Sequence, residues 1–134
     1  MVVADAPLWF DLFNVGWALP RLAGHELYYS ETSLLEALRK IVEVLRGRPA
    51  GDIQRVVEGV QAIRDSVSHA PMTAEAVEQA IRMHVMGHWD MVDNLLYSVA
   101  LANSLTLLTI DDSLVGFIRR HKLPEECITM PEEL

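Results

Sequence analysis

Acidic residues bracket the most apolar stretch of the sequence, and this spacing is typical of chemistry that depends on carboxylates. The stretch DNLLYSVALANSLTLLTIDD begins at Asp93, ends with Asp111 and Asp112, and has 17 uncharged residues between them. Two further acids accompany other apolar segments, Asp5 after VVA and Glu36 within SETSLLEAL. Crowded carboxylates repel one another unless a cation neutralises them, and hard oxygen ligands favour Mg²⁺ or Mn²⁺. If these segments converge, the chemistry is metal-assisted attack of water on a phosphodiester.

The apolar stretch also predicts the elements that would bring Asp93 and Asp111 together. Trp89 to Ala102 favours a helix that is apolar on nearly every face, and Leu105 to Ile110 favours a strand buried on both faces. If these are the last two arms of a βαβ crossover, the helix runs antiparallel to the strand and begins beside the strand's carboxyl end. The two acids then meet at the edge where open α/β sheets bind ligands.

The rest of the sequence predicts a single α/β domain over residues 1–134. The order β-α-β-α-α-α-α-β-α-β indicates a central parallel sheet with helices on both faces. A break at Arg46–Gly51 precedes two amphipathic helices that should form a helical lobe, with a turn at His69–Met72 between them. The other expected elements are strands at Val2–Asp5, His25–Ser30 and Cys127–Met130, helices at Leu8–Val15, Ser30 or Ser33 to Arg46, Asp52–Val67, Thr73–Met86 and Ser113–His121, and a loop at Gly16–Gly24.

Composition limits the classes of function. Cys127 is the only cysteine, so no internal disulfide can form and a cytoplasmic protein is expected. The first ten residues lack Lys and Arg, which favours a first strand over a signal peptide, and no membrane span is expected. A hydrophobic content of 51% and a mean hydropathy of +0.18 predict apolar surface covered by a partner, as in a homodimer. The net charge of −8 argues against general nucleic-acid affinity.

Three of the acids have simple structural explanations as well. Asp5 can cap a helix that begins at Pro7, a common use of Asp after a strand. Asp111 or Asp112 can cap the helix that follows them. The sequence does not decide between capping and metal binding at these positions.

Glu36 and Asp93 differ in how easily structure explains them. Glu36 can complete a capping box with Ser33 or pair with Lys40 four residues later. Asp93 lies on a helix face whose other residues are apolar, where a carboxylate is costly without a partner. Asp93 is therefore the stronger candidate for a site.

Other residue patterns point to structure. His84 and His88 have the i, i+4 spacing of zinc ligands, but Gly87 stands between them and no third ligand is evident, so they are interpreted as helix-end histidines. The sequence has no Gly-rich phosphate loop, nucleophile elbow or CxxC motif. The aromatic residues near the N-terminus are interpreted as core or dimer contacts; they are Trp9, Phe10, Phe13 and Trp17.

The acidic motifs resemble the PIN-domain family, metal-dependent ribonucleases that include the VapC toxins of prokaryotic toxin-antitoxin pairs. Family members resemble D-x-L-x-x-x-x-A, an apolar strand, and then T-x-D-x-x-hydrophobic. VVAD resembles the family's first strand and acid, and SETSLLEAL its second acidic motif. Ala6 and Pro7 depart from the Ser, Thr or Asn that often follows the first acid, and Ser104 replaces a frequent glycine. The matching positions are Asp93, Leu95, Ala100, Thr109, Asp111 and Leu114.

The resemblance implies a three-layer α/β/α fold and a cytoplasmic endoribonuclease that uses Mg²⁺ or Mn²⁺. It also implies an RNA substrate, a homodimer and an antitoxin protein as partners. Thr109 would support the ligands through its hydroxyl, and Asp112 would be a substitute or additional ligand. The catalytic and metal-binding residues would be Asp5, Glu36, Asp93 and Asp111. RNA would approach along Arg39, Lys40, Arg46, Arg119, Arg120 and Lys122.

Two other functions fit the same sequence. One is a non-catalytic PIN-like module that assembles with a partner protein through its apolar helices. The other is a DNA nuclease of the flap-endonuclease type, which would need a longer chain and added DNA-binding elements.

Overall fold

Five parallel strands form one sheet within the part of the chain that the computed structural model describes, residues 2–4, 25–47, 50–109, 111–130 and 133. They are β1 (Val2–Ala4), β2 (Leu27–Tyr29), β3 (Ser68–His69), β4 (Thr106–Leu108) and β5 (Ile128–Thr129). The helices of these residues are α3 (Glu31–Leu45), α4 (Ala50–Ser66), α5 (Ala74–Val85), α6 (Met91–Ala102) and α7 (Asp112–Arg120). Asp5, the expected helix Leu8–Val15 and the loop Gly16–Gly24 lie outside the described residues.

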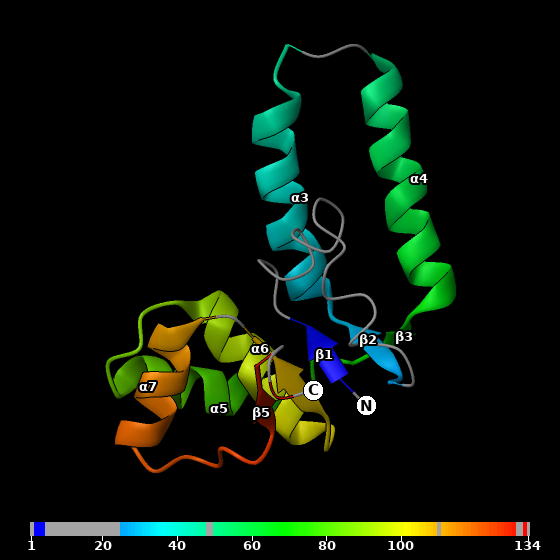
Figure 1. The fold of residues 1–134 in the computed structure, drawn as a ribbon. Coiled ribbons are helices and arrows are strands. Elements are labelled where there is room, and N and C mark those ends of the chain that lie inside the picture. Colours follow the sequence, from blue (N-terminus) through cyan, green and yellow to red (C-terminus); the bar gives the residue numbers. More distant parts are fainter. Residues whose placement is uncertain (1, 5–24, 48–49, 110, 131–132, 134) are drawn as a thin grey trace.

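The sheet has its switch point between two central strands. Its strand order is β3-β2-β1-β4-β5, so the chain proceeds outward from β1 in one direction and from β4 in the other (Figure 1). Val2 pairs with Thr106 and Ala4 with Leu108, which aligns the carboxyl ends of β1 and β4. Such a switch point is where open α/β sheets bind ligands. The predicted parallel sheet is confirmed, and the carboxyl ends of these two strands form the edge at which the sequence predicts ligand binding.

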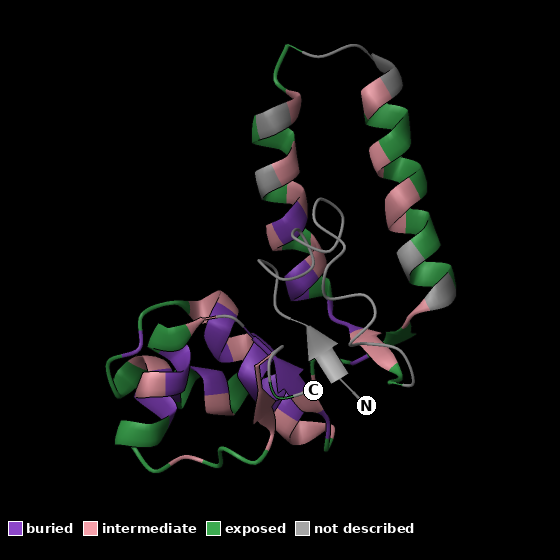
Figure 2. Cartoon of the chain, viewed as in Figure 1, coloured by how far each residue is buried: buried purple, intermediate pink, exposed green. Residues whose placement is uncertain are grey.

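The crossover predicted from the apolar stretch is also confirmed. Helix α6 packs against the sheet and, on its other side, against α5. Leu96, Tyr97 and Val99 are fully buried in it, as is Leu107 in β4. Because both sides of α6 are covered, its lack of a polar stripe follows from its position. Figure 2 shows the buried residues gathered around α5, α6, α7 and β4.

Three helices end in the same hydrogen-bonded turn. After α6, the N–H of Ser104 donates to the Leu101 carbonyl at 3.3 Å and that of Leu105 to the Ala100 carbonyl at 2.8 Å, which is a Schellman motif. Its central residue needs the left-handed conformation, and Ser104 adopts it with φ of 54°. Gly87 after α5 and Lys122 after α7 take the same place. Glycine is therefore the residue that this turn favours, although it stands at one of these three positions.

The helices α3 and α4 form a hairpin that projects from the sheet (Figure 1). Helix α3 begins at the Ser30 cap, whose hydroxyl accepts from the Ser33 N–H at 3.2 Å, and Ser33 completes the capping box. Helix α4 makes few contacts with α3, whereas α5 packs along α6. The prediction that α4 and α5 form a helical lobe is therefore wrong, because α5 finds its apolar partner in α6 and α4 belongs to the projecting hairpin.

The predicted turn at His69–Met72 is partly wrong, since His69 belongs to strand β3. This strand pairs with β2 at the edge of the sheet and has two exposed residues, so it lacks the apolar pattern by which strands are predicted. The His69 Nε2 atom lies 2.5 Å from Glu31 Oε1, and its ring lies 5.2 Å from that of Tyr29. These contacts attach the edge strand to the start of α3.

No helix in the described part of the chain is long and apolar enough to cross a membrane.

Replacing Ser104 by glycine should stabilise the protein. A side chain in the left-handed region is strained, and this exposed serine has that conformation, so Ser104→Gly should raise the free energy of unfolding by roughly 0.5 to 1 kcal/mol. Urea denaturation measures the change. Ser113→Gly, at an exposed helical position, should lower stability; a loss of stability in both variants would contradict the expectation.

Glu31→Gln should destabilise the protein only above the pH at which Glu31 becomes protonated. The hydrogen bond from His69 lowers the pKa of Glu31 below its ordinary 4.5, so the carboxylate stabilises the fold above that pH and loses this effect as the pH falls through the lowered pKa. Both side chains are substantially exposed, which limits the effect to less than about 1 kcal/mol. Urea unfolding at pH 6 and pH 3 tests this, with Glu75→Gln as the control for an acid in a first helical turn. A difference from the parent that persists at pH 3 would refute it.

Candidate metal centre

Asp111 is held where β4 ends and α7 begins. Thr109 is fully buried and its N–H donates to the Thr129 carbonyl at 3.0 Å, which continues the sheet beyond β4. Its hydroxyl accepts a hydrogen bond from the Asp111 N–H at 3.0 Å. Asp111 Oδ1 in turn accepts from the N–H groups of Ser113 at 2.9 Å and Leu114 at 3.2 Å. Asp111 is thus the N-cap of α7, as one of its structural explanations predicted, and its carboxylate has a defined position at the sheet edge.

Asp93 occupies the first turn of α6. Asp90 caps this helix, with Oδ1 accepting from the N–H groups of Val92 at 3.0 Å and Asp93 at 3.2 Å. The cap directs α6 so that its first turn meets the end of β4, and the Asp93 residue is only 8% exposed. Asp90 was not predicted as a cap, although an Asp directly before an apolar helix is a usual cap signal.

The two carboxyl groups contact each other. The pKa of Asp111 is lowered, chiefly because its carboxylate accepts a hydrogen bond from the Asp93 carboxyl group. The backbone N–H groups of the α7 cap and the charge of His88 lower it further, and partial burial opposes them. Each carboxyl group also lies at the positive end of a helix. The structure therefore brings Asp93 and Asp111 together at the edge where the crossover predicted that they would meet.

A buried histidine lies beside this pair. The His88 Nδ1–H donates to Asn94 Oδ1 at 2.6 Å, while the Asn94 amide donates to the His88 carbonyl at 2.8 Å. The ring also lies 4.8 Å from that of Phe117 on α7. These contacts fix the segment between α5 and α6. The interpretation of His88 as a helix-end residue missed this role, although a buried Asn inside an apolar helix requires a partner and was a usable signal.

The Gly87 turn stands between His84 and His88, and the described residues do not place the two histidines in a zinc site. His84 ends α5, and its ring makes an edge-to-face contact with Trp89 at a centroid distance of 4.8 Å. In the described part of the chain no three His, Cys, Asp or Glu side chains form a group that could hold a metal. The carboxylates of Asp93 and Asp111 are thus a pair within those residues.

Glu36 lies on α3, roughly 8 Å along the helix from its start at the sheet edge. Its carboxylate forms a two-point ion pair with Arg39, with Oε2 accepting from the Arg39 Nε–H at 3.1 Å and Oε1 from the other guanidinium nitrogen. The side chain is 18% exposed, so the pair lies near the body of the protein. The capping box expected between Glu36 and Ser33 is instead formed by Ser30 and Ser33, and the Lys40 side chain is outside the described residues.

Of the two remaining predicted acids, Asp112 is described by the structure and Asp5 is not. Asp112 is the first residue of α7 and is exposed, and Asp111 rather than Asp112 is the cap. Asp5 is outside the described residues, but Ala4 before it pairs with Leu108, three residues before Asp111.

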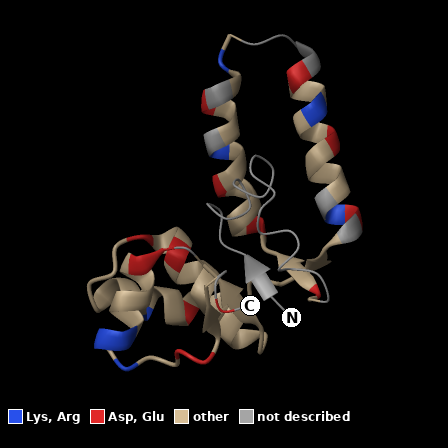
Figure 3. Cartoon of the chain, in the orientation of Figure 1, with Lys and Arg blue, Asp and Glu red and all other residues tan. Residues whose placement is uncertain are grey.

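Most of the basic residues along which RNA was predicted to approach lie away from this edge. Arg119, Arg120 and Lys122 are at or beyond the last turn of α7, roughly 13 Å along the helix from Asp111. Figure 3 shows this basic end of α7 apart from the acidic residues near the start of α6. On α3, Arg46 is at the far end, whereas Arg39 is paired with Glu36 and also interacts electrostatically with Asp90 at the start of α6. Among the predicted basic residues whose side chains the structure describes, Arg39 is therefore the one that lies toward the carboxyl pair.

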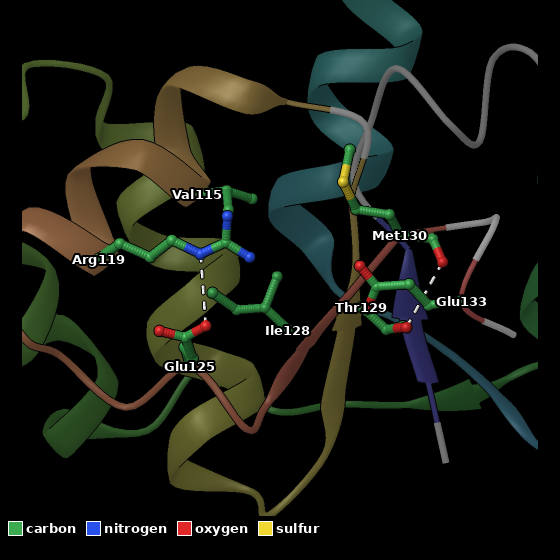
Figure 4. A pocket seen from close by; sticks show the side chains of 7 residues that line it. All are labelled: Val115, Arg119, Glu125, Ile128, Thr129, Met130 and Glu133. Atoms are coloured by element: carbon green, nitrogen blue, oxygen red, sulfur yellow. Dashed lines mark hydrogen bonds and ion pairs between the residues drawn. The ribbon is translucent and has the colours of Figure 1, made fainter.

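A pocket of about 130 Å³ lies between α7 and β5, separate from the carboxyl pair. Its wall includes the ion pair of Arg119 and Glu125, 3.3 Å apart, opposite Thr129 and Met130 (Figure 4). Glu125 offsets the charge of Arg119, and the pocket lies apart from Asp93 and Asp111, so it does not alter the assignment of the site.

Comparison with known proteins supports the fold. No protein-family model matches the sequence, and no curated protein matches it. Among solved structures, the chain is similar to the crystal structure of PAE2754 from Pyrobaculum aerophilum, with a TM-score of 0.63 and 18% sequence identity over 98% of this chain and 90% of that one. At this identity the likeness shows a shared α/β fold over nearly the whole chain.

The capping role of Asp111 can be tested apart from any activity. Asp111→Ala removes both hydrogen bonds to the α7 N-terminus and should lower the free energy of unfolding by about 1 kcal/mol. Asp111→Asn retains an acceptor oxygen and should unfold within about 0.5 kcal/mol of the parent. Urea denaturation compares them, and an equal loss in both variants would show that the carboxylate charge rather than the cap stabilises this edge.

Proposed function

We propose that this protein is a metal-dependent nuclease of the PIN type with a three-layer α/β/α fold, acting on RNA. The observation that carries the proposal is the contact between the carboxyl groups of Asp93 and Asp111 at the switch point of the sheet. The PIN-like spacing of the acids and the fold shared with PAE2754 support it.

The residues present fit Mg²⁺ or Mn²⁺. Asp93 and Asp111 supply hard oxygen atoms from two rigid helix N-termini, and their proximity is unfavourable when both are ionised unless a cation lies between them. In this proposal Asp5 completes the ligand set, and Glu36 would join it by leaving its ion pair with Arg39. The Thr109 hydroxyl orients Asp111 by accepting a hydrogen bond from its backbone N–H, and Asp112 stays at the exposed margin. A bound ion of this kind lowers the pKa of a water molecule and neutralises charge on a phosphate.

The chain's own residues have distinct tasks. Asp111 and Asp93 would orient the attacking water and accept its proton, since their carboxyl groups contact each other at this edge. Asp90 and the α7 cap hold the two carboxylates, so their positions are set before substrate binds. His88 fixes the segment before α6 through its hydrogen bonds with Asn94.

The proposed biological role also comes from the resemblance to PIN-domain proteins. A cytoplasmic VapC-type toxin that cleaves RNA, forms a homodimer and is restrained by an antitoxin would have this size and this acidic site. The net charge of −8 means that the protein as a whole does not attract RNA phosphates. The charge is consistent with RNA binding through cations that the protein holds.

Calorimetric titration with Mn²⁺, followed by cleavage of a fluorescent single-stranded RNA, tests the proposal. Asp93→Asn and Asp111→Asn should each weaken Mn²⁺ binding at least about tenfold and lower the cleavage rate at least about 100-fold, because they keep the side-chain size and remove a charged ligand. Asp90→Asn is the matched control: it keeps the α6 cap and should bind and cleave as the parent does.

The outcomes separate this function from its alternative. Metal binding and cleavage that survive both substitutions would show that the site lies elsewhere. Absence of both in the parent protein would favour the non-catalytic PIN-like module, in which the carboxyl pair serves only to join α6 to α7. Cleavage of single-stranded DNA in preference to RNA would assign a different substrate to the same site.

A further inference from the structure

The ion pair between Glu36 and Arg39 joins a proposed metal ligand to a cation of its own helix. The Arg39 Nε–H donates to Glu36 Oε2 at 3.1 Å, and a second guanidinium nitrogen donates to Oε1. A two-point pair of this kind fixes the direction of the carboxylate as well as neutralising it. Both oxygen atoms of Glu36 therefore face a positive charge that the chain itself supplies.

The two partners of this pair differ in their exposure to water. The Glu36 side chain is 18% exposed and lies near the body of the protein, whereas that of Arg39 is 62% exposed. Water solvates an exposed guanidinium readily, so Arg39 loses little when its partner turns away. The pair is therefore one that a stronger cation can open.

Other carboxylates surround Arg39. The hydrogen bond to Glu36 raises the pKa of Arg39 above its ordinary value, and the charges of Glu43 and Asp90 raise it further. Glu43 is one turn further along α3, and Asp90 caps α6, where it accepts from the Asp93 N–H at 3.2 Å. Helix α3 also packs against α6. The guanidinium is thus within electrostatic reach of the helix that carries Asp93, and acids stay near it when Glu36 leaves.

We propose that Arg39 is an internal counter-ion that competes with the divalent cation for Glu36. It would set the metal concentration at which the acidic site becomes complete. Below that concentration Glu36 stays with Arg39, and above it Glu36 turns toward the ion and the guanidinium is released. This inference rests on the proposed nuclease site and adds to it a positioning residue that regulates metal binding.

The charges determine how strong this competition is. A hard divalent cation attracts a carboxylate more strongly than a guanidinium does, because it carries twice the charge and prefers oxygen ligands. An ion pair with one partner largely exposed contributes little to stability, so opening it weakens metal binding by roughly three- to fivefold. The counter-ion therefore shifts the threshold for metal binding and does not prevent it.

Calorimetric titration with Mn²⁺ tests the competition. Arg39→Gln should lower the Mn²⁺ Kd about three- to fivefold, because Glu36 then has no guanidinium to leave. The direction of the change is informative, since a variant that only disturbed the site would bind Mn²⁺ more weakly.

Arg55→Gln is the matched control for a lost charge. Arg55 lies three residues after Asp52, 4.0 Å from it, near the end of the α3–α4 hairpin that is away from the sheet (Figure 1). This variant should bind Mn²⁺ as the parent does.

A double-mutant cycle separates the pair from the bare charge of Arg39. Glu36→Gln should weaken Mn²⁺ binding, and adding Arg39→Gln should then change the Kd less than about twofold, because no ion pair remains to break. The electron paramagnetic resonance signal of free Mn²⁺ follows the weaker binding of these variants. A three- to fivefold tightening that persisted without Glu36 would overturn the proposal, because Arg39 would then act by its charge alone.

The remaining outcomes distinguish this inference from the nuclease proposal. Mn²⁺ binding that is lost in Asp93→Asn but is unchanged or weakened by Arg39→Gln would overturn the counter-ion and leave the nuclease proposal standing. Binding that Glu36→Gln does not alter would also overturn it. A parent protein that binds no Mn²⁺ would overturn both.

Discussion

The contact between the start of α6 and the end of β4 is the constraint on which the rest of the structure depends. An antiparallel helix and strand in a crossover place the helix N-terminus beside the strand's carboxyl end. Here each of those ends carries a carboxylate, and α7 starts at the same point, so two helix N-termini face one acidic pair. The positive ends of the two helices offset part of the repulsion between the carboxyl groups.

Polar residues inside the apolar core serve this constraint. Asn94 and Thr109 are fully buried, and each hydrogen-bonds to the backbone of a segment that carries or borders the acidic pair. Burying such groups is costly unless they are paired, so each restricts its segment to one geometry. The acids are consequently held in place by the protein's own hydrogen bonds, which is the condition for a preorganised site.

Sequence reasoning was most accurate where the pattern was local and strong. The uncharged run predicted α6 and β4, and chirality then predicted that Asp93 and Asp111 meet. The frequent glycine at Ser104 pointed to a turn whose positive φ the structure shows. Where a residue's role depended on distant neighbours, prediction failed: the pairing of β3 with β2, the packing of α5 on α6 instead of α4, and the contact of His88 with Asn94.

Alone, the sequence determined the element order, the parallel sheet and the meeting of two acids, because helical and strand periodicity and crossover handedness are properties of the chain itself. Only the tertiary structure decided that Asp111 both caps α7 and contacts Asp93, that Glu36 pairs with Arg39, and that the α7 cations lie far from the acidic edge. Those outcomes depend on which side chains the packed helices bring within a few ångströms, and no spacing along one segment specifies them.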